Sequence, residues 1–296
     1  MQEPRRDKRS QARQDGERSE FVDALKKGAL VGAALLLFLV PAVRMHKSQQ
    51  APQVATAPQV PAQPRSPAPP AARAPVVRLA DFRGDEPSAE ARLVANWVLT
   101  TGNAGRHAFV LVDKRDARVY VFGPEGRLKD SAPALMGAAR GDDSFPGIGD
   151  KPLAAVRPEE KTTPAGRFVA EPGRNANNED IVWVSYDLAV SMHRVRPLVA
   201  RERRLERLAS QTTDDNRISF GCINLPVTFY EDVLSPTVQK YGAIVYVLPE
   251  VKTAQEVFGA YDVTDPQQAA AAAQVRAQKA AVAPSALRQV ALTANR

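Results

Sequence analysis

An uninterrupted apolar run stands between two polar segments near the start of the chain. It covers residues 28–43, GALVGAALLLFLVPAV, with lysines before it and Arg44 and Lys47 after it. The run is shorter than the roughly 20 residues of a usual spanning helix, but it is apolar all round and offers no face to water. We therefore expect one transmembrane anchor at 28–43, preceded by a cytoplasmic stub at 1–27.

The charged residues on either side of this run indicate which side of a membrane each end of the chain would occupy. Lys and Arg are more frequent just before it than just after it, which favours a cytoplasmic N-terminus and a periplasmic remainder at the inner membrane. A cleaved signal peptide, with secretion, is the alternative. The leader is long and acidic for that role, and the nearest small-x-small site, at 55–57, lies well downstream. Residues 44–78 are rich in Pro, Ala and Gln, which predicts a disordered, extended linker.

Beyond the linker, the hydrophobic pattern changes from helical spacing to alternation. Leu93, Val94, Trp97 and Val98 recur at helical spacing within 87–103. Alternating or short apolar runs then predict strands, and two further segments are typical of helices. The expected strands are 108–113, 118–123, 131–137, 181–186, 189–193 and 243–249, and the expected helices are 201–210 and 227–241.

These elements predict a folded domain over residues 79–250 that is mainly β with a few short helices. The chain then becomes an Ala/Gln-rich low-complexity tail, 251–296, which offers little to bury. Trp97 and Trp183 are expected in the core. We find no internal repeat.

Net charge and cysteine content limit the classes of function that the chain can have. The formal net charge is +7, but Lys and Arg are spread along the chain without a basic stripe, so we expect no nucleic-acid partner. The single cysteine, Cys222, excludes an intrachain disulfide. Asp142 and Asp143 lack an evident third ligand, so we expect a turn there and no metal or cofactor.

Cys222 is either a nucleophile or a small core residue. A cysteine reacts as its thiolate and needs a base or a positive neighbourhood. Of the three histidines, His193 ends a predicted strand, from which it can reach a cleft. Gly221 permits a sharp turn, and the amides of Gly221 and Cys222 could face a developing oxyanion. A Cys–His pair with backbone donors suffices for acyl transfer, although a lone cysteine is more often packing.

The surroundings of Cys222 resemble the L,D-transpeptidase (YkuD-type) family of cysteine transpeptidases. His193, a spacer and 219-SFGCIN-224 follow the family's order of a histidine and then Ser/Thr-His-Gly-Cys, an apolar residue and Asn or Arg. Upstream, the hairpin 109-FVLVDKRDARVYVF-122, the segment ending at Gly137 and 163-TPAGRF-168 match further elements in the same order. The resemblance covers about residues 107–249 and implies the family's β-sandwich.

The resemblance also implies roles for individual residues. Cys222 would be the nucleophile and His193 the general base, oriented by the backbone carbonyl of Arg194. The remaining implied roles concern the turn and the substrate. Ser219 and Gly221 would shape the cysteine turn, the Gly221 and Cys222 amides would stabilise the oxyanion, and Asn224 would support the loop or contact the donor peptide. Phe220 is expected to meet substrate as well.

The implied reaction is transfer of a peptidoglycan stem peptide through a thioester, without a cofactor. The thiolate attacks the third residue of a tetrapeptide and releases D-alanine, and an amine or water resolves the thioester.

Two differences from the family's motif leave alternative functions open. Phe220 replaces the motif histidine, and 196–217 is an insertion between base and nucleophile, expected to be a basic helical lid or a solvated surface helix. The rivals are a degenerate protein that binds peptidoglycan, and an L,D-carboxypeptidase or amidase.

Overall fold

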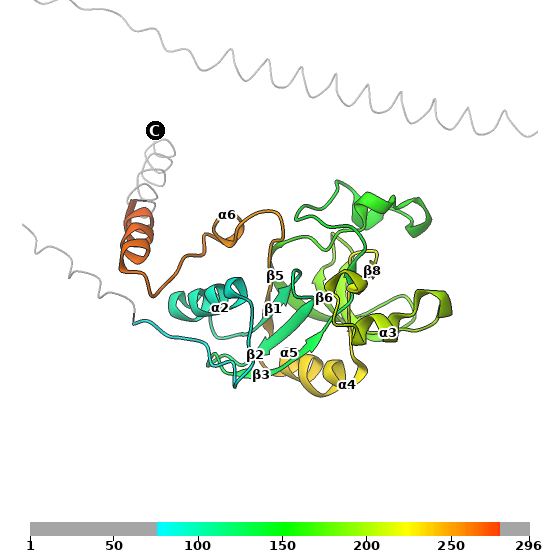
Figure 1. Ribbon diagram of the computed structural model, residues 1–296, viewed down its shortest axis with the longest axis horizontal. Coiled ribbons are helices and arrows are strands. Elements are labelled where there is room, and N and C mark those ends of the chain that lie inside the picture. The colour runs from blue at the N-terminus through cyan, green and yellow to red at the C-terminus, as the bar shows by residue number, and fades with distance from the viewer. Residues whose placement is uncertain (1–75, 279–296) are drawn as a thin grey trace, which may run out of the picture. The chain divides into compact units, whose positions relative to one another are not determined.

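The computed structural model describes residues 76–278 (Figure 1). The expected stub at 1–27, the anchor at 28–43, all but the last residues of the linker and the end of the tail lie outside the described residues. Within residues 76–278, the chain contains no helix with the length and hydrophobicity that crossing a membrane requires.

Strands dominate the described part, as the hydrophobic pattern predicted, with short helices between them. The strands are β1 (Ala108–Asp113), β2 (Arg118–Phe122), β3 (Leu128–Pro133), β4 (Met136–Gly137), β5 (Gly166–Arg174), β6 (Asp180–Ser185), β7 (Val190–Arg194), β8 (Arg217–Ser219), β9 (Ile223–Leu225) and β10 (Ala243–Val247). The α-helices are α2 (Ala89–Thr101), α3 (Arg204–Ala209), α4 (Val227–Phe229), α5 (Ser235–Tyr241) and α6 (Ala254–Phe258). A π-helical turn, Tyr230–Leu234, joins α4 to α5, and short 3-10 turns lie at 148–150, 153–155, 158–160, 200–202 and 213–216.

Eight strands form one sheet in the order β3-β2-β1-β10-β5-β6-β7-β9, and β4 pairs with β8 separately. Most neighbours are antiparallel, but β10 runs parallel to β1, and β9 runs parallel to β7. Strand β9 begins directly after Cys222, and β7 contains His193. The sheet therefore brings together two segments that the long insertion separates in sequence.

The alternation of β1 explains why all of its residues are buried. Phe109 and Leu111 point into a core that includes Val94 and Trp97 of α2. Val110 and Val112, like other alternate residues of β1 and β2, point into a second core on the opposite face. A strand covered on both faces reads as a continuous apolar run, as 108-AFVLVD-113 does.

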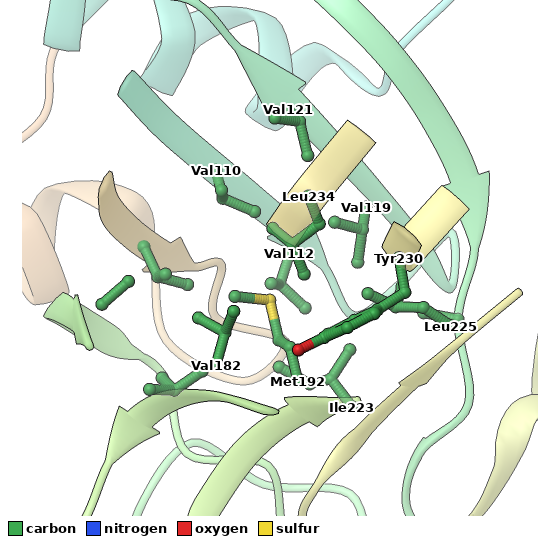
Figure 2. Close-up of a cluster of buried hydrophobic side chains, with 14 of the residues drawn as sticks. Val110, Val112, Val119, Val121, Val182, Met192, Ile223, Leu225, Tyr230 and Leu234 are labelled. Carbon is green, nitrogen blue, oxygen red and sulfur yellow. The ribbon is translucent and has the colours of Figure 1, made fainter. Parts of the chain in front are cut away.

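The second core lies between the two ends of the sheet, as expected for a sandwich-like arrangement. Figure 2 shows Val110, Val119 and Val121 of the first strands on one side of it. Met192 of β7 and Ile223 of β9 point toward them from the other side, and both are fully buried. This packing fixes β7 and β9, and with them the candidate site, against the rest of the domain.

Three expectations about the elements need correction. The strand expected at 131–137 is instead β3 at 128–133 and the short β4, because Lys129 and Asp130 lie exposed on an edge strand that has no apolar alternation. Strand β5 was not predicted, since most of its side chains are exposed and backbone pairing to β10 and β6 defines it. Trp97 is in the core, but Trp183 is only half buried and lies edge-on to Tyr186.

The packed region also continues past residue 250. Ala254, Ala260 and Val263 are buried in the core that α2 covers, and Phe258 packs against it. Residues 266–278 then form a mostly exposed helix. The first part of the expected tail is therefore part of the folded domain.

Candidate active site

The register between β7 and β9 sets the arrangement of the candidate site. Met192 pairs with Ile223, and His193 pairs with Asn224, in parallel. In parallel strands, residues in register point to the same side, and successive residues alternate. Met192 and Ile223 enter the core, so the opposite face of the two strands carries the polar side chains. Ser191, His193, Cys222 and Asn224 share that face.

The thiol of Cys222 contacts a hydroxyl, which can donate to its anion, and a backbone carbonyl oxygen, which accepts only from the protonated thiol. Its Sγ lies 3.6 Å from Ser191 Oγ and 3.5 Å from the carbonyl oxygen of Ala189. Burial alone raises the pKa of Cys222, but the nearby imidazole of His193, with the hydroxyl and backbone amide of Ser191, outweighs it. The pKa therefore lies below the ordinary thiol value, which is the condition for a nucleophilic cysteine.

The imidazole of His193 is oriented by the backbone. Its Nδ1 lies 2.8 Å from the carbonyl oxygen of Arg194, as the resemblance implied. Because a carbonyl oxygen only accepts, Nδ1 carries a proton, so in the neutral ring Nε2 is the nitrogen that can take a proton from a thiol. Arg194 is itself anchored: its guanidinium contacts Asp180 and Glu231 and lies 4.4 Å from the ring centre of Tyr230.

Hydrogen bonds of Ser219 shape the turn before Cys222. Its Oγ accepts from the Gly221 amide at 3.1 Å and donates to the Cys222 carbonyl at 2.6 Å. Gly221 has a φ of 133°, and a Cβ there would lie 2.7 Å from the carbonyl oxygen of Thr162, so only glycine fits. The Gly221 amide was expected to face the oxyanion, but Ser219 occupies it, which leaves the Cys222 amide as the remaining backbone candidate.

A buried threonine attaches this turn to the rest of the fold. Thr163 is fully buried; its Oγ1 donates to the Gly221 carbonyl at 2.8 Å and accepts from the Gly137 amide at 2.9 Å. The carbonyl of Thr163 in turn accepts from the buried ammonium of Lys114 at 3.0 Å. The segment 163–168 therefore holds the cysteine turn from behind, a role that its sequence motif did not reveal.

Asp142 has a structural role, consistent with the turn expected there. It forms a 2.8 Å ion pair with Lys114, and its two oxygens accept from the backbone amides of Glu250, Val251 and Lys252. Burial raises the pKa of Asp142, but these bonds hold it at about 2. The carboxylate thus joins the loop after Gly141 to the end of β10.

Asn224 does not face a substrate, contrary to one of its expected roles. It is fully buried, its Nδ2 donates to the Cys222 carbonyl at 3.2 Å, and its Oδ1 accepts from Arg204 at 2.6 Å. With both ends of the amide occupied, Asn224 supports the loop, which was its other expected role. Arg204 belongs to the insertion, so this segment is neither a detached surface helix nor only a lid.

The insertion packs behind the site through a small apolar cluster. Leu208 of α3 is buried with Leu135 and Val195, and Ile218 packs against them. Asn216 donates to the Ala134 carbonyl at 3.0 Å. The predicted helix at 201–210 is present in part, as α3 after a 3-10 turn at 200–202.

A cavity of about 480 Å³ opens on the His193 side of the site. Its walls include Arg174, Asp180, Arg196, Leu198 and Val227. His193 lines this cavity, whereas Cys222 is not among its lining residues. A molecule in the cavity would therefore reach His193 without lying against Cys222. Phe220 is exposed at the rim of the turn, as a residue that meets substrate would be.

Ser191, Thr163 and Arg204 were missed by sequence reasoning. Ser191 could have been found from the alternation of β7, since it lies two residues before His193 on the same face. Thr163 and Arg204 act through contacts between segments far apart in sequence. No local pattern indicates such contacts.

Comparisons with known proteins give similarities among solved structures alone. No protein-family model matches the chain, and no curated protein matches it significantly. The helical cell shape determining protein Pgp2 from Campylobacter jejuni is 19% identical over 51% of this chain and 50% of that chain, with a TM-score of 0.32. An L,D-transpeptidase from Xylanimonas cellulosilytica is 15% identical over 48% of this chain and 60% of that chain, with a TM-score of 0.29.

The third similar structure is a catalytic domain alone. The L,D-transpeptidase catalytic domain from Enterococcus faecium is 15% identical over 48% of this chain and 98% of that chain, with a TM-score of 0.25. The chain thus spans about half the length of Pgp2 and nearly all of this catalytic domain. The similar structures include L,D-transpeptidase domains, the family that the sequence motifs resemble.

Proposed function

We propose that this chain is a cysteine acyltransferase that acts on peptidoglycan stem peptides. The observation that carries the proposal is the parallel register of β7 and β9, which places Cys222, Ser191 and His193 on one face. The lowered pKa of Cys222 and the orientation of His193 by the Arg194 carbonyl support it. The order of motifs, which resembles L,D-transpeptidases, supplies the substrate class.

The proposed acylation begins with proton transfer from the Cys222 thiol to Nε2 of His193. The thiolate attacks the carbonyl carbon of the third residue in a tetrapeptide, and the Cys222 amide donates to the resulting oxyanion. When this intermediate collapses, the C–N bond breaks and the imidazolium gives its proton to the leaving D-alanine amine. The product is a thioester on Cys222 with a neutral His193.

In the second half of the reaction, His193 acts first as the base and the sulfur of Cys222 becomes the leaving group. An acceptor amine attacks the thioester carbonyl, His193 takes the proton of the amine, and the sulfur leaves as thiolate. The leaving and attacking amines both exchange a proton with His193, so both must come within reach of Nε2 beside Cys222. Water in place of the amine would give a carboxypeptidase.

The decisive test is formation of a covalent adduct at Cys222. Intact-protein mass spectrometry after incubation with a carbapenem should show one added molecule on the wild-type chain and none on Cys222→Ser. Absence of the adduct together with absence of thiol reactivity at neutral pH would refute the proposal that this chain is an enzyme. It would leave a protein that binds peptidoglycan without chemistry, the alternative that Phe220 raised.

A second assay separates transfer from hydrolysis. Tetrapeptide fragments with an amine-bearing acceptor should give a cross-linked dimer, whereas a trimmed tripeptide alone would identify an L,D-carboxypeptidase.

We also propose that residues 28–43 anchor the chain in the inner membrane with the catalytic part in the periplasm. Protease added to spheroplasts should digest the folded domain, and release of the chain by salt alone would contradict the anchor.

A further inference from the structure

Phe220 and Lys161 form an unusual pair at the rim of the cysteine turn. The Phe220 side chain is 40% exposed, although its neighbours Ser219 and Gly221 are buried. The ammonium of Lys161 lies 4.2 Å from the centre of its ring. A cation at this distance from an aromatic face is attracted by the ring quadrupole, so the ring holds the ammonium in place.

The charge of Lys161 is not neutralised by a neighbouring carboxylate. Nearby, Lys151 and Arg157 both form ion pairs with Glu160. Lys161 takes part in none of the ion pairs found within residues 76–278. An aromatic ring positions a cation without cancelling its charge, so the ammonium stays available to an anion.

Backbone bonds fix the segment of Lys161 against the cysteine turn. The Lys161 carbonyl accepts from the Ala139 amide at 3.0 Å, and two residues later Thr163 donates to the Gly221 carbonyl. The Thr162 carbonyl lies against Gly221. The segments 161–163 and 219–222 therefore run beside each other, and the ammonium lies over a residue two positions before the nucleophile.

We propose that Lys161 and Phe220 form a subsite for a carboxylate of the acyl-donor peptide. The ring would pack against the apolar part of the donor, and the ammonium would pair with the carboxylate. The inference rests on the proposed function, since it names the group that this site recognises. It also gives Phe220 a role in this chain as the residue that positions a cation.

The test uses matched donor peptides that differ by one carboxylate. One tetrapeptide has both its C-terminal and its side-chain carboxylates, a second has a C-terminal amide, and a third has a side-chain amide. The ratio of kcat/KM for the acid over each amide identifies the carboxylate that the wild-type chain prefers. We expect a preference of about fivefold for one of the two, the size of one partly exposed charge pair.

Lys161→Gln should reduce this ratio toward one. Phe220→Leu keeps an apolar side chain but removes the aromatic face, so it should lower the ratio in the same direction. Lys151→Gln is the matched control, because that lysine already pairs with Glu160, and it should keep the wild-type ratio. Turnover with an unchanged ratio in Lys161→Gln would overturn the subsite and leave the enzyme intact.

Binding to Cys222→Ser provides a measurement that does not need turnover. Calorimetry should show the same carboxylate preference in Kd for Cys222→Ser, and its loss when Lys161→Gln is added. If Cys222 forms no adduct but this preference is present, the proposed reaction fails and the subsite stands. If the peptides bind without a carboxylate preference, the subsite is refuted.

Discussion

The hydroxyl of Thr163 should connect the stability of the fold to the reactivity of Cys222. The substitution Thr163→Val keeps the shape of the side chain and removes the oxygen. It leaves the Gly137 amide and the Gly221 carbonyl without the partner that each has now. The residue is fully buried, so water cannot replace the hydroxyl without rearrangement.

The expected loss of stability follows from these two groups. A buried donor or acceptor left unpaired costs about 1–3 kcal/mol, so the two together cost roughly 2–6 kcal/mol. For a domain of this size, each kcal/mol lowers Tm by about 2–4 °C. We therefore expect thermal unfolding of Thr163→Val at least about 4 °C below wild type.

Reactivity should fall even where the variant is folded, because the Gly221 carbonyl belongs to the turn that places Cys222. Differential scanning fluorimetry gives Tm, and the rate of carbapenem acylation by mass spectrometry, well below Tm, gives reactivity. Thr162→Val is the matched control, since Thr162 donates only to the Asp143 carbonyl at 2.9 Å. A Thr163→Val chain that melts within about 1 °C of wild type and reacts at the same rate would refute the reasoning.

Three further predictions follow from the same contacts. The alkylation rate of Cys222 should reach half its maximum below pH 9.0, the reference thiol pKa. In His193→Ala this midpoint should move to higher pH, because burial without the imidazole raises the pKa of Cys222. Stopped-flow alkylation across a pH series measures the midpoint. Arg204→Leu should cost about 1–3 kcal/mol in chemical denaturation, because it leaves the buried Oδ1 of Asn224 unpaired. Truncation after residue 252 should destabilise the domain by about 3 kcal/mol or more, since it removes Val263 and its neighbours from the core.

Two of these predictions have a control on this chain. Arg203→Leu removes an arginine whose side chain is 70% exposed, so it should cost under about 1 kcal/mol. Truncation after residue 265 keeps the buried residues Ala254, Ala260 and Val263 and should leave unfolding nearly unchanged. An alkylation midpoint that stays fixed in His193→Ala, or an Arg204→Leu chain as stable as Arg203→Leu, would contradict the respective contact.

The sequence predicted the strands that have strong alternation and the helices that have clear apolar spacing. It could not predict β5, whose side chains are mostly exposed and whose position depends on backbone pairing. It also placed the end of the domain too early, because Ala254 and Ala260 have no distinctive pattern until they meet the core. Burial of small residues depends on what packs over them, which composition alone does not give.

For the site, the order of motifs named Cys222 and His193, and the register of β7 and β9 places both residues on one face of the sheet. The Gly221 amide could not be assigned from sequence, because its use depends on the rotamer of Ser219. The burial of Asn224 likewise depends on Arg204, which a long insertion brings back to the turn. Sequence motifs identify reactive side chains more readily than the hydrogen bonds that hold them.

Phe220 stands where the motif that the sequence resembles has a histidine. Its position in the fold shows which property of the site this difference affects. The proposed pair of Cys222 and His193 is positioned by the alternation of β7 and β9, where Met192 and Ile223 in the core fix the opposite face. Phe220 lies outside β9, in the turn, and its ring points to Lys161 and solvent. Replacing a motif histidine at this position therefore leaves the thiol and imidazole in register. If the proposed function holds, the substitution changes the surface that a donor peptide meets, so its effect should be sought in substrate preference before it is sought in loss of the nucleophile.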